Sequence, residues 1–243
     1  MPIGPAALFV VHATGGLPSV WRAISPLTLG RLARMAGDDD SMRLARGPIG
    51  ERRLERARRI VDLAWRDLPG QHRLLLENIG ASRWQVLDRP LGNSVNDLLI
   101  SAGYAQLLPA GRVSLDRALG MWIERLHLVL IDAGHSVLAD LDDQTFELML
   151  VRTAWHEWGH ALSVVRAEHD DVAAGERLLD LAPDGVREFI RRAGYRRSEY
   201  THELIAEIYA LLMSRRRRGH TGQPPWLADE IYRLVRRVSG WSE

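Results

Sequence analysis

The chain has 243 residues, which is long enough for one hydrophobic core with a small appendage. Hydrophobic residues make up 46% of it and charged residues 26%, a balance typical of a folded globular domain and not of a disordered chain. The formal net charge of +1 gives no overall attraction to polyanions, and the absence of cysteine excludes disulfides and thiolate metal sites.

The sequence predicts two parts, an N-terminal arm over residues 1–48 and a single domain over residues 49–243. The arm is rich in glycine and proline. The domain begins with a helix over residues 51–66, where apolar residues recur on one face. A second, short helix is expected over residues 71–79, closed by Gly80.

The next stretch predicts a few strands. Residues 83–88 alternate and contain aromatic and β-branched side chains, which favours a strand. Two short runs at 102–107 and 112–116 surround a Pro-Ala-Gly turn and predict a hairpin. For residues 119–131 a helix is favoured over a strand, because the apolar run is long and has no turn signal.

The second half of the domain is predicted to be helical. The longest pattern starts after Asp142 or Asp143, either of which is a suitable N-cap. The expected helices cover residues 144–165, 183–192, 199–216 and 226–238.

The longest predicted helix contains the pattern His156-Glu157-x-x-His160. Four residues are about one helical turn, so both imidazoles project from one face and can bind the same ion. Glu157 lies about 100° around the helix from His156, close enough to hold a metal-bound water without becoming a ligand. With no thiolate in the chain, imidazole and carboxylate ligands point to a catalytic zinc ion.

A catalytic zinc ion needs a third protein ligand and an open fourth position. The extended pattern that ends in a third histidine fails here, because Ser163 and Arg166 stand where Gly and His are required. The third ligand is therefore expected further along the chain. The candidates are Glu203, His202, Glu199, His169 and Asp170.

Glu203-x-x-Ala206-Glu207 resembles the gluzincin group of zincin metallopeptidases, which includes thermolysin-type and lethal-factor-like peptidases. The resemblance covers the helix of the His-Glu-x-x-His pattern and residues 199–214. It implies that His156, His160 and Glu203 bind zinc, that Glu157 is the general base, and that Glu207 hydrogen-bonds a ligand imidazole.

The same resemblance implies an α+β, zincin-like fold that is mostly helical with a small mixed sheet. An edge strand of that sheet would lie beside the His-Glu-x-x-His helix and receive an extended peptide as a further strand. The strands at 102–107 and 112–116 are the candidates for this place. The segment 161–202 is longer than in thermolysin, and its helix at 183–192 is expected to overhang the cleft.

A donor other than the metal is needed to stabilise the negative oxygen of the transition state. Tyr195, Tyr200 and His202 precede or begin the helix of Glu203, and relatives supply a Tyr or His of this kind. All three stay open as candidates.

The sequence thus predicts a zinc-dependent peptidase that acts on a peptide or protein substrate. The rival interpretations are a regulatory or partner-binding protein of the same fold, including an exported toxin-like effector, and a nucleic-acid binder. The run Arg215–Arg218 suggests the latter, but cations at a helix C-terminus complement the helix dipole and no nucleic acid is expected.

No apolar run approaches the roughly 20 residues that span a bilayer, and no signal peptide is recognised. A cytoplasmic or unconventionally exported protein is expected, and its oligomeric state stays open.

Overall fold

A computed structural model gives the fold of most of the chain beyond residue 48. The described ranges are 49–89, 91, 118–166, 172–192, 195 and 197–241, without the side chains of residues 125 and 164–166. The predicted arm at 1–48 and the predicted hairpin at 102–107 and 112–116 lie outside these ranges. His169 and Asp170, two of the alternative third ligands, lie outside them too.

Six predicted helices are confirmed to within a few residues at each end. They are α3 (Glu51–Arg66), α4 (Gly70–Asn78), α7 (Asp143–Arg166), α9 (Asp184–Arg192), α10 (Tyr200–Arg217) and α11 (Asp229–Ser239). The sequence did not predict α6 (Ser136–Ala139), α8 (Val172–Leu181) or the 3-10 turn η4 (Arg197–Glu199). Among the described helices, none combines the length and the apolar character that crossing a bilayer requires.

The strands form one small mixed sheet in the order β1-β3-β2. The predicted strand at 83–88 is confirmed as β1 (Trp84–Leu87), which runs parallel to β3 (Leu128–Asp132). On the other side of β3, β2 (Gly120–Ile123) pairs with it in antiparallel register. Within the described part of the chain β2 is an outer strand, and it packs against α7. A mostly helical α+β fold with a small mixed sheet is therefore present.

The prediction of one helix over residues 119–131 is wrong, because β2 and β3 share this stretch. The chain reverses between them through a short 3-10 turn, η3 (Glu124–Leu126), and through His127, whose φ of 48° is left-handed. Histidine adopts this conformation more readily than most residues do, so the turn carries no Gly or Pro signal. The long apolar run is a pair of short strands, of which β3 is wholly buried and β2 partly buried.

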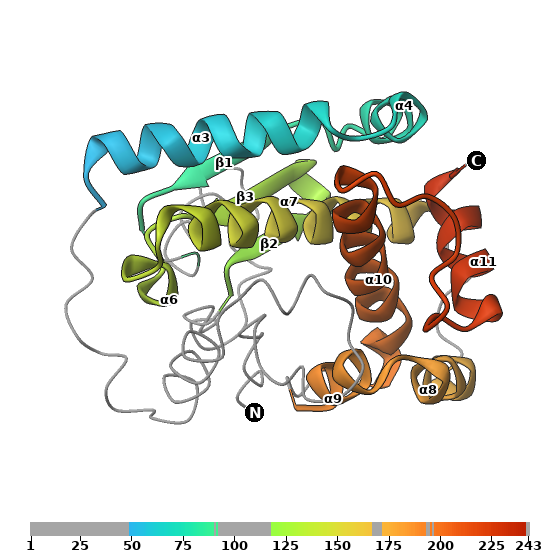
Figure 1. The fold of residues 1–243 in the computed structure, drawn as a ribbon. Coiled ribbons are helices and arrows are strands. Elements are labelled where there is room, and N and C mark those ends of the chain that lie inside the picture. The colour runs from blue at the N-terminus through green and yellow to red at the C-terminus, as the bar shows by residue number, and fades with distance from the viewer. Residues whose placement is uncertain are drawn as a thin grey trace, which may run out of the picture.

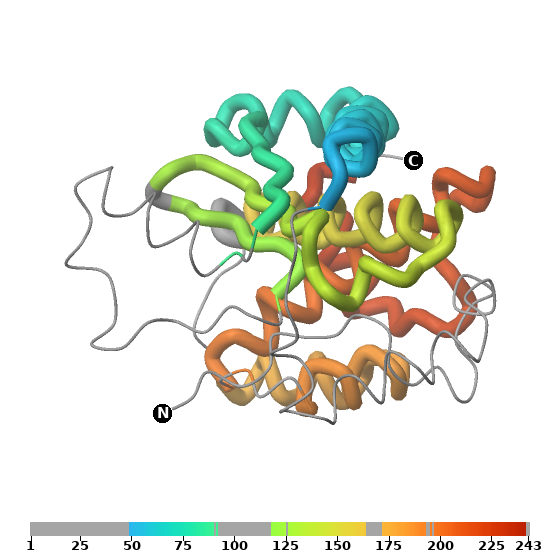
Figure 2. The backbone as a smooth tube through the Cα atoms, turned by 90° about the vertical axis from the view of Figure 1, so that its left-hand side faces the viewer, coloured from blue at the N-terminus to red at the C-terminus, as the bar shows by residue number. Residues whose placement is uncertain are grey.

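The helices lie on both sides of α7 and the sheet. In two views at right angles, α3 and α4 lie on one side and α8 and α9 on the other (Figures 1 and 2). Helix α10 crosses α7 and is surrounded by α7, α8, α9 and α11 (Figure 1). Residues 203–214 of α10 are all buried, as expected of a helix with neighbours on all sides.

Two tryptophans anchor α7 on the side of α3 and β1. The indole N–H of Trp155 donates to the carbonyl oxygen of Ala64 over 3.1 Å. Trp158 packs edge-on against Trp65 and Trp84, with ring centroids 5.2 and 5.8 Å away. At the start of the helix, Asp142 is the N-cap, since its carboxylate accepts from the backbone N–H of Thr145 over 2.9 Å. These contacts fix the rotation of α7 about its axis and hence the direction of its histidines.

Gly159 lets α7 and α10 approach closely at their crossing. A Cβ atom at this position would lie 2.9 Å from the Cα of Ala206 and 3.3 Å from its carbonyl oxygen. Backbone atoms cannot move away as a flexible side chain can, so any larger residue must push the helices apart. The close approach brings the side chains before and after Gly159 within reach of those on α10.

Gly159→Ala is expected to lower the free energy of unfolding by about 1–3 kcal/mol, because the added methyl group overpacks the crossing. An unconstrained Gly→Ala change in a helix would instead stabilise by about 0.5–1 kcal/mol. Urea denaturation followed by circular dichroism measures the difference. Gly70→Ala is the matched control, since nothing lies within 4 Å of a Cβ there. A Gly159→Ala midpoint at or above that of the control would contradict the steric argument.

Candidate metal centre

Helix α7 places His156 and His160 one turn apart with their rings facing each other. The two Nε2 atoms are 2.9 Å apart, and the ring planes are inclined by 83°. Two imidazole nitrogens at this distance need a cation between them, either a proton or a metal ion, because two lone pairs repel. The geometry thus presents a paired nitrogen site on the face of α7 that meets α10.

Helix α10 brings the carboxylate of Glu203 to the same point. Its two oxygens lie 3.7 Å from His156 Nε2 and 3.5 Å from His160 Nε2. One ligand atom from each of the three residues falls within 4.8 Å of the others, so the group can hold a metal ion. Tetrahedral coordination with bonds of about 2.0–2.1 Å separates ligand atoms by roughly 3.3 Å, and the three observed separations bracket this value.

Without a metal ion the group retains protons, which a bound cation would displace. Burial raises the pKa of Glu203 to about 8, and the carboxylates of Glu157 and Glu207 add to this. Burial lowers the pKa of His160 well below its ordinary value, which leaves its lone pair available. The buried Oε2 of Glu203 has no hydrogen-bond partner among the described residues. An unpaired carboxyl oxygen beside two imidazoles fits a metal ligand, since a buried polar atom otherwise requires a partner.

Solvent reaches His160 and Glu203 more than it reaches His156. The side chains of His160 and Glu203 keep 17% and 11% of their exposure, whereas that of His156 keeps 2%. A metal ion held by the three residues would therefore lie at the boundary between the core and the surface.

Glu157 lies between the metal group and β2. The backbone N–H of Trp122 donates to its carboxylate, and burial raises its pKa to about 7. Gly120 makes this contact possible, because a Cβ there would lie 2.7 Å from the Oε1 of Glu157. A buried carboxylate that changes protonation state near neutral pH is suited to accept and return a proton.

Glu207 lies one turn beyond Glu203 and contacts the other nitrogen of His156. Its Oε1 is 3.2 Å from His156 Nδ1, and its Oε2 accepts from Arg152 over 2.5 Å. Burial opposes ionisation of Glu207, but Arg152 and His156 outweigh it and lower its pKa to about 2. Its ionised carboxylate is placed to accept the Nδ1 proton of His156, so that the neutral imidazole presents its Nε2 lone pair to the group.

The three predicted oxyanion donors lie in different surroundings. The hydroxyl of Tyr195 is hydrogen-bonded to Glu203, and burial raises its pKa well above the ordinary value. Tyr200 is partly buried and packs against the core. His202 turns its Nδ1 to the Oγ of Ser163, 2.9 Å away. Tyr195 is thus the candidate that contacts a predicted ligand directly.

The rival third ligands among the described residues lie elsewhere. His202 and Glu199 do not belong to the group of three, and Glu199 is exposed in η4. Glu203 is therefore the carboxylate that the described structure brings to the two imidazoles.

Comparison with protein families, curated proteins and solved structures found no match in any of the three. The gluzincin resemblance consequently stays a prediction.

Two residues near the group were not singled out from the sequence as part of the site. Arg152 stands four residues before His156, a spacing that places it on the same face of α7, but its partner on α10 is 55 residues away. Gly120 begins β2, a strand that the sequence did not predict, so nothing in the sequence indicated its approach to Glu157.

Proposed function

We propose that this protein is a zinc-dependent peptidase, in which His156, His160 and Glu203 hold the metal and Glu157 is the general base. The observation that carries the proposal is the convergence of two imidazoles and one buried carboxylate, from two crossing helices, within 4.8 Å. Two histidines and one glutamate with an open position are the ligand set of catalytic zinc in metallopeptidases.

Zinc bound there would polarise a carbonyl group and lower the pKa of a water molecule to about 7. The chain's own residues would do the rest. Glu157, held by the backbone N–H of Trp122, would take the proton of the attacking water and pass it to the leaving amine. Glu207 would keep the ring of His156 in the tautomer that presents Nε2.

Tyr195 is the described side chain best placed to donate a hydrogen bond to the developing oxyanion. Its hydroxyl already lies at Glu203, and its raised pKa keeps it protonated at neutral pH. The substrate is proposed to be a peptide segment, since β2 offers an outer strand next to Glu157 within the described part of the fold.

Metal content measured by mass spectrometry on the full chain tests the proposal. The native chain is expected to carry about one zinc ion, and His160→Ala is expected to lose it, because two ligands hold zinc far more weakly than three. His220→Ala is the control, since His220 is exposed beyond the end of α10. Cleavage of a mixed peptide library should stop on chelation and return with added zinc.

Equal zinc in the native chain and in His160→Ala would remove the metal site. Zinc lost from His160→Ala alone, with no cleavage of any peptide by the native chain, would leave a metal-binding protein and contradict the peptidase.

A further inference from the structure

We propose that Arg152 is a positioning residue of the metal centre, which orients the imidazole of His156 by holding the carboxylate of Glu207. The inference rests on the proposed function in one respect, that a metal ion binds at His156, His160 and Glu203. The inference adds Arg152, which would act on the metal ion indirectly, through Glu207 and His156.

Two rows of side chains meet where α7 and α10 cross. On α7, Arg152, His156 and His160 follow one another at intervals of four residues and so lie along one face. On α10, Glu203 and Glu207 have the same spacing. The contacts alternate between the rows: Arg152 to Glu207, Glu207 to His156, His156 to Glu203, and Glu203 to His160. Arg152 therefore continues the metal group by one helical turn.

The donor and acceptor at each of these contacts follow from the donors of Arg152. A guanidinium has donors only, so Oε2 of Glu207 must accept from Arg152 over 2.5 Å. With that oxygen engaged, Oε1 faces His156 Nδ1 over 3.2 Å. A carboxylate fixed in this way accepts the Nδ1 proton, and the lone pair of His156 is left on Nε2, 2.9 Å from Nε2 of His160. Loss of Arg152 would remove the hydrogen bond that holds this oxygen of Glu207.

Burial makes the pairing specific. The side chains of Arg152 and Glu207 are 6% and 2% exposed, so water cannot replace either partner. The three buried carboxylates around the site, Glu157, Glu203 and Glu207, carry three negative charges when ionised. A divalent ion and the guanidinium of Arg152 together carry three positive charges. A divalent ion alone would leave one of the three negative charges unbalanced, and Arg152 balances it.

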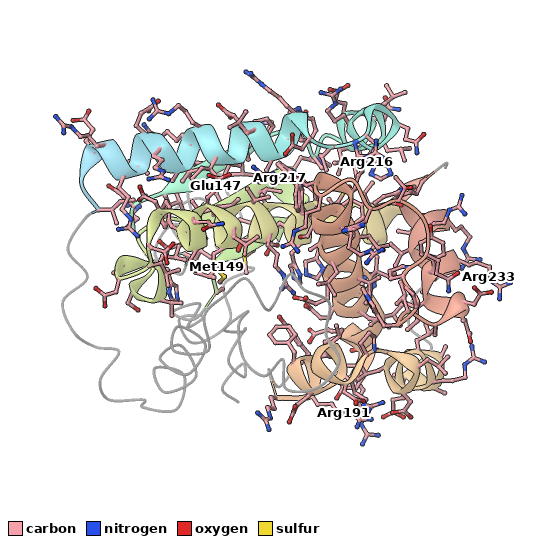
Figure 3. The ribbon with its side chains drawn as sticks, in the orientation of Figure 1. Glu147, Met149, Arg191, Arg216, Arg217 and Arg233 are labelled. Atoms are coloured by element: carbon pink, nitrogen blue, oxygen red, sulfur yellow. The ribbon has the colours of Figure 1, made fainter. Side chains whose placement is uncertain are left out.

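The same two helices offer a matched control pair. Arg217 of α10 contacts Glu147 of α7 over 2.8 Å, but both side chains are more than a third exposed. Figure 3 labels both residues: Glu147 lies near the start of α7 and Arg217 at the end of α10. Loss of this arginine removes an interhelical ion pair without touching His156.

The test measures zinc affinity by competition with a chromophoric chelator, on the full chain. Arg152→Met and Arg152→Gln are compared with Arg217→Met and with the wild-type chain. Arg152→Met is expected to bind zinc about 10- to 100-fold more weakly, as loss of an outer hydrogen-bond partner does at other metal sites. Arg152→Gln keeps an N–H donor and is expected to lose less. Arg217→Met is expected to keep wild-type affinity.

A second measurement is the imidazole 15N chemical shifts of the zinc-free chain. They report which ring nitrogen of His156 carries the proton, which a purely structural role of Arg152 would not change. At pH 10, above the raised pKa of His156 of about 9, the ring is neutral. There wild-type His156 is expected to show a protonated Nδ1, and both Arg152 variants a mixture of tautomers. Adding Glu207→Gln to either Arg152 variant should weaken zinc binding no further than Glu207→Gln alone, because Arg152 acts through Glu207.

Wild-type affinity and a wild-type His156 signal in whichever Arg152 variant folds would overturn the inference. So would additive losses in the double variant. A wild-type chain that binds no zinc would instead contradict the proposed function, so the two failures are distinguishable.

Discussion

Replacing Glu157 with glutamine is expected to lower kcat/KM for peptide cleavage by roughly 10²- to 10⁴-fold while zinc content stays unchanged. Glutamine keeps the size of the side chain and can still occupy the place next to Trp122, but it cannot take a proton. His156, His160 and Glu203 are untouched, so metal binding should persist. Initial rates on a peptide that the native chain cleaves, together with metal content by mass spectrometry, give both quantities.

The control for this variant is Glu147→Gln, on the same helix. Glu147 contacts Arg217 near the surface and lies more than two turns before Glu157, so its loss should leave turnover within about twofold. Full activity in Glu157→Gln would exclude this residue as the general base. Zinc lost along with activity would show that the variant disturbs the metal group and not the proton transfer.

Sequence periodicity was sufficient for the long helices and insufficient for the sheet. The apolar faces of α3 and α7 recur at helical spacing, and their ends carry ordinary signals such as Asp142. The β2–β3 hairpin has no such signal, because its turn depends on His127 in a left-handed conformation. A run of short apolar strands then has the same composition as a buried helix.

Within the candidate site, the sequence could predict the features that depend on residues close together in the chain. The spacing of His156 and His160 determines their shared face, whatever the rest of the fold. Glu203 lies 43 residues beyond His160, and only the resemblance to gluzincins favoured it over its neighbours. Arg152 could not be inferred, because an arginine on a helix face is usually solvated and only the tertiary crossing buries it against Glu207.

Chelator-treated protein is expected to lose stability as the pH rises from 7 to 9. In the folded chain burial raises the pKa of Glu157 to about 7 and that of Glu203 to about 8. Burial opposes the charge of His156, but Glu207, Glu157 and Glu203 outweigh it and raise its pKa to about 9. All three shifts are upward, so the folded chain holds protons that the unfolded chain has already released.

The sign follows from proton linkage. A group with a raised pKa in the folded state binds more protons folded than unfolded, so the free energy of unfolding falls as the pH rises through that pKa. Groups with lowered pKa values act below this range: His72, whose pKa burial lowers to about 4, is neutral in the folded chain throughout. The expected loss between pH 7 and 9 is on the order of 3 kcal/mol, from urea denaturation at each pH.

Zinc is expected to remove this pH dependence. A metal ion replaces the protons on His156 and Glu203. Fewer protons compete with it as the pH rises, so its affinity rises with pH. With free zinc at about 1,000 times its Kd, the chain should gain about 4 kcal/mol over chelated protein. Glu203→Gln cannot ionise at this position and should show a shallower pH slope without zinc and little gain with it. Stability that rises from pH 7 to 9 in the chelated protein would contradict the raised pKa values of these three groups. Stability that zinc leaves unchanged would contradict a metal ion bound at His156, His160 and Glu203.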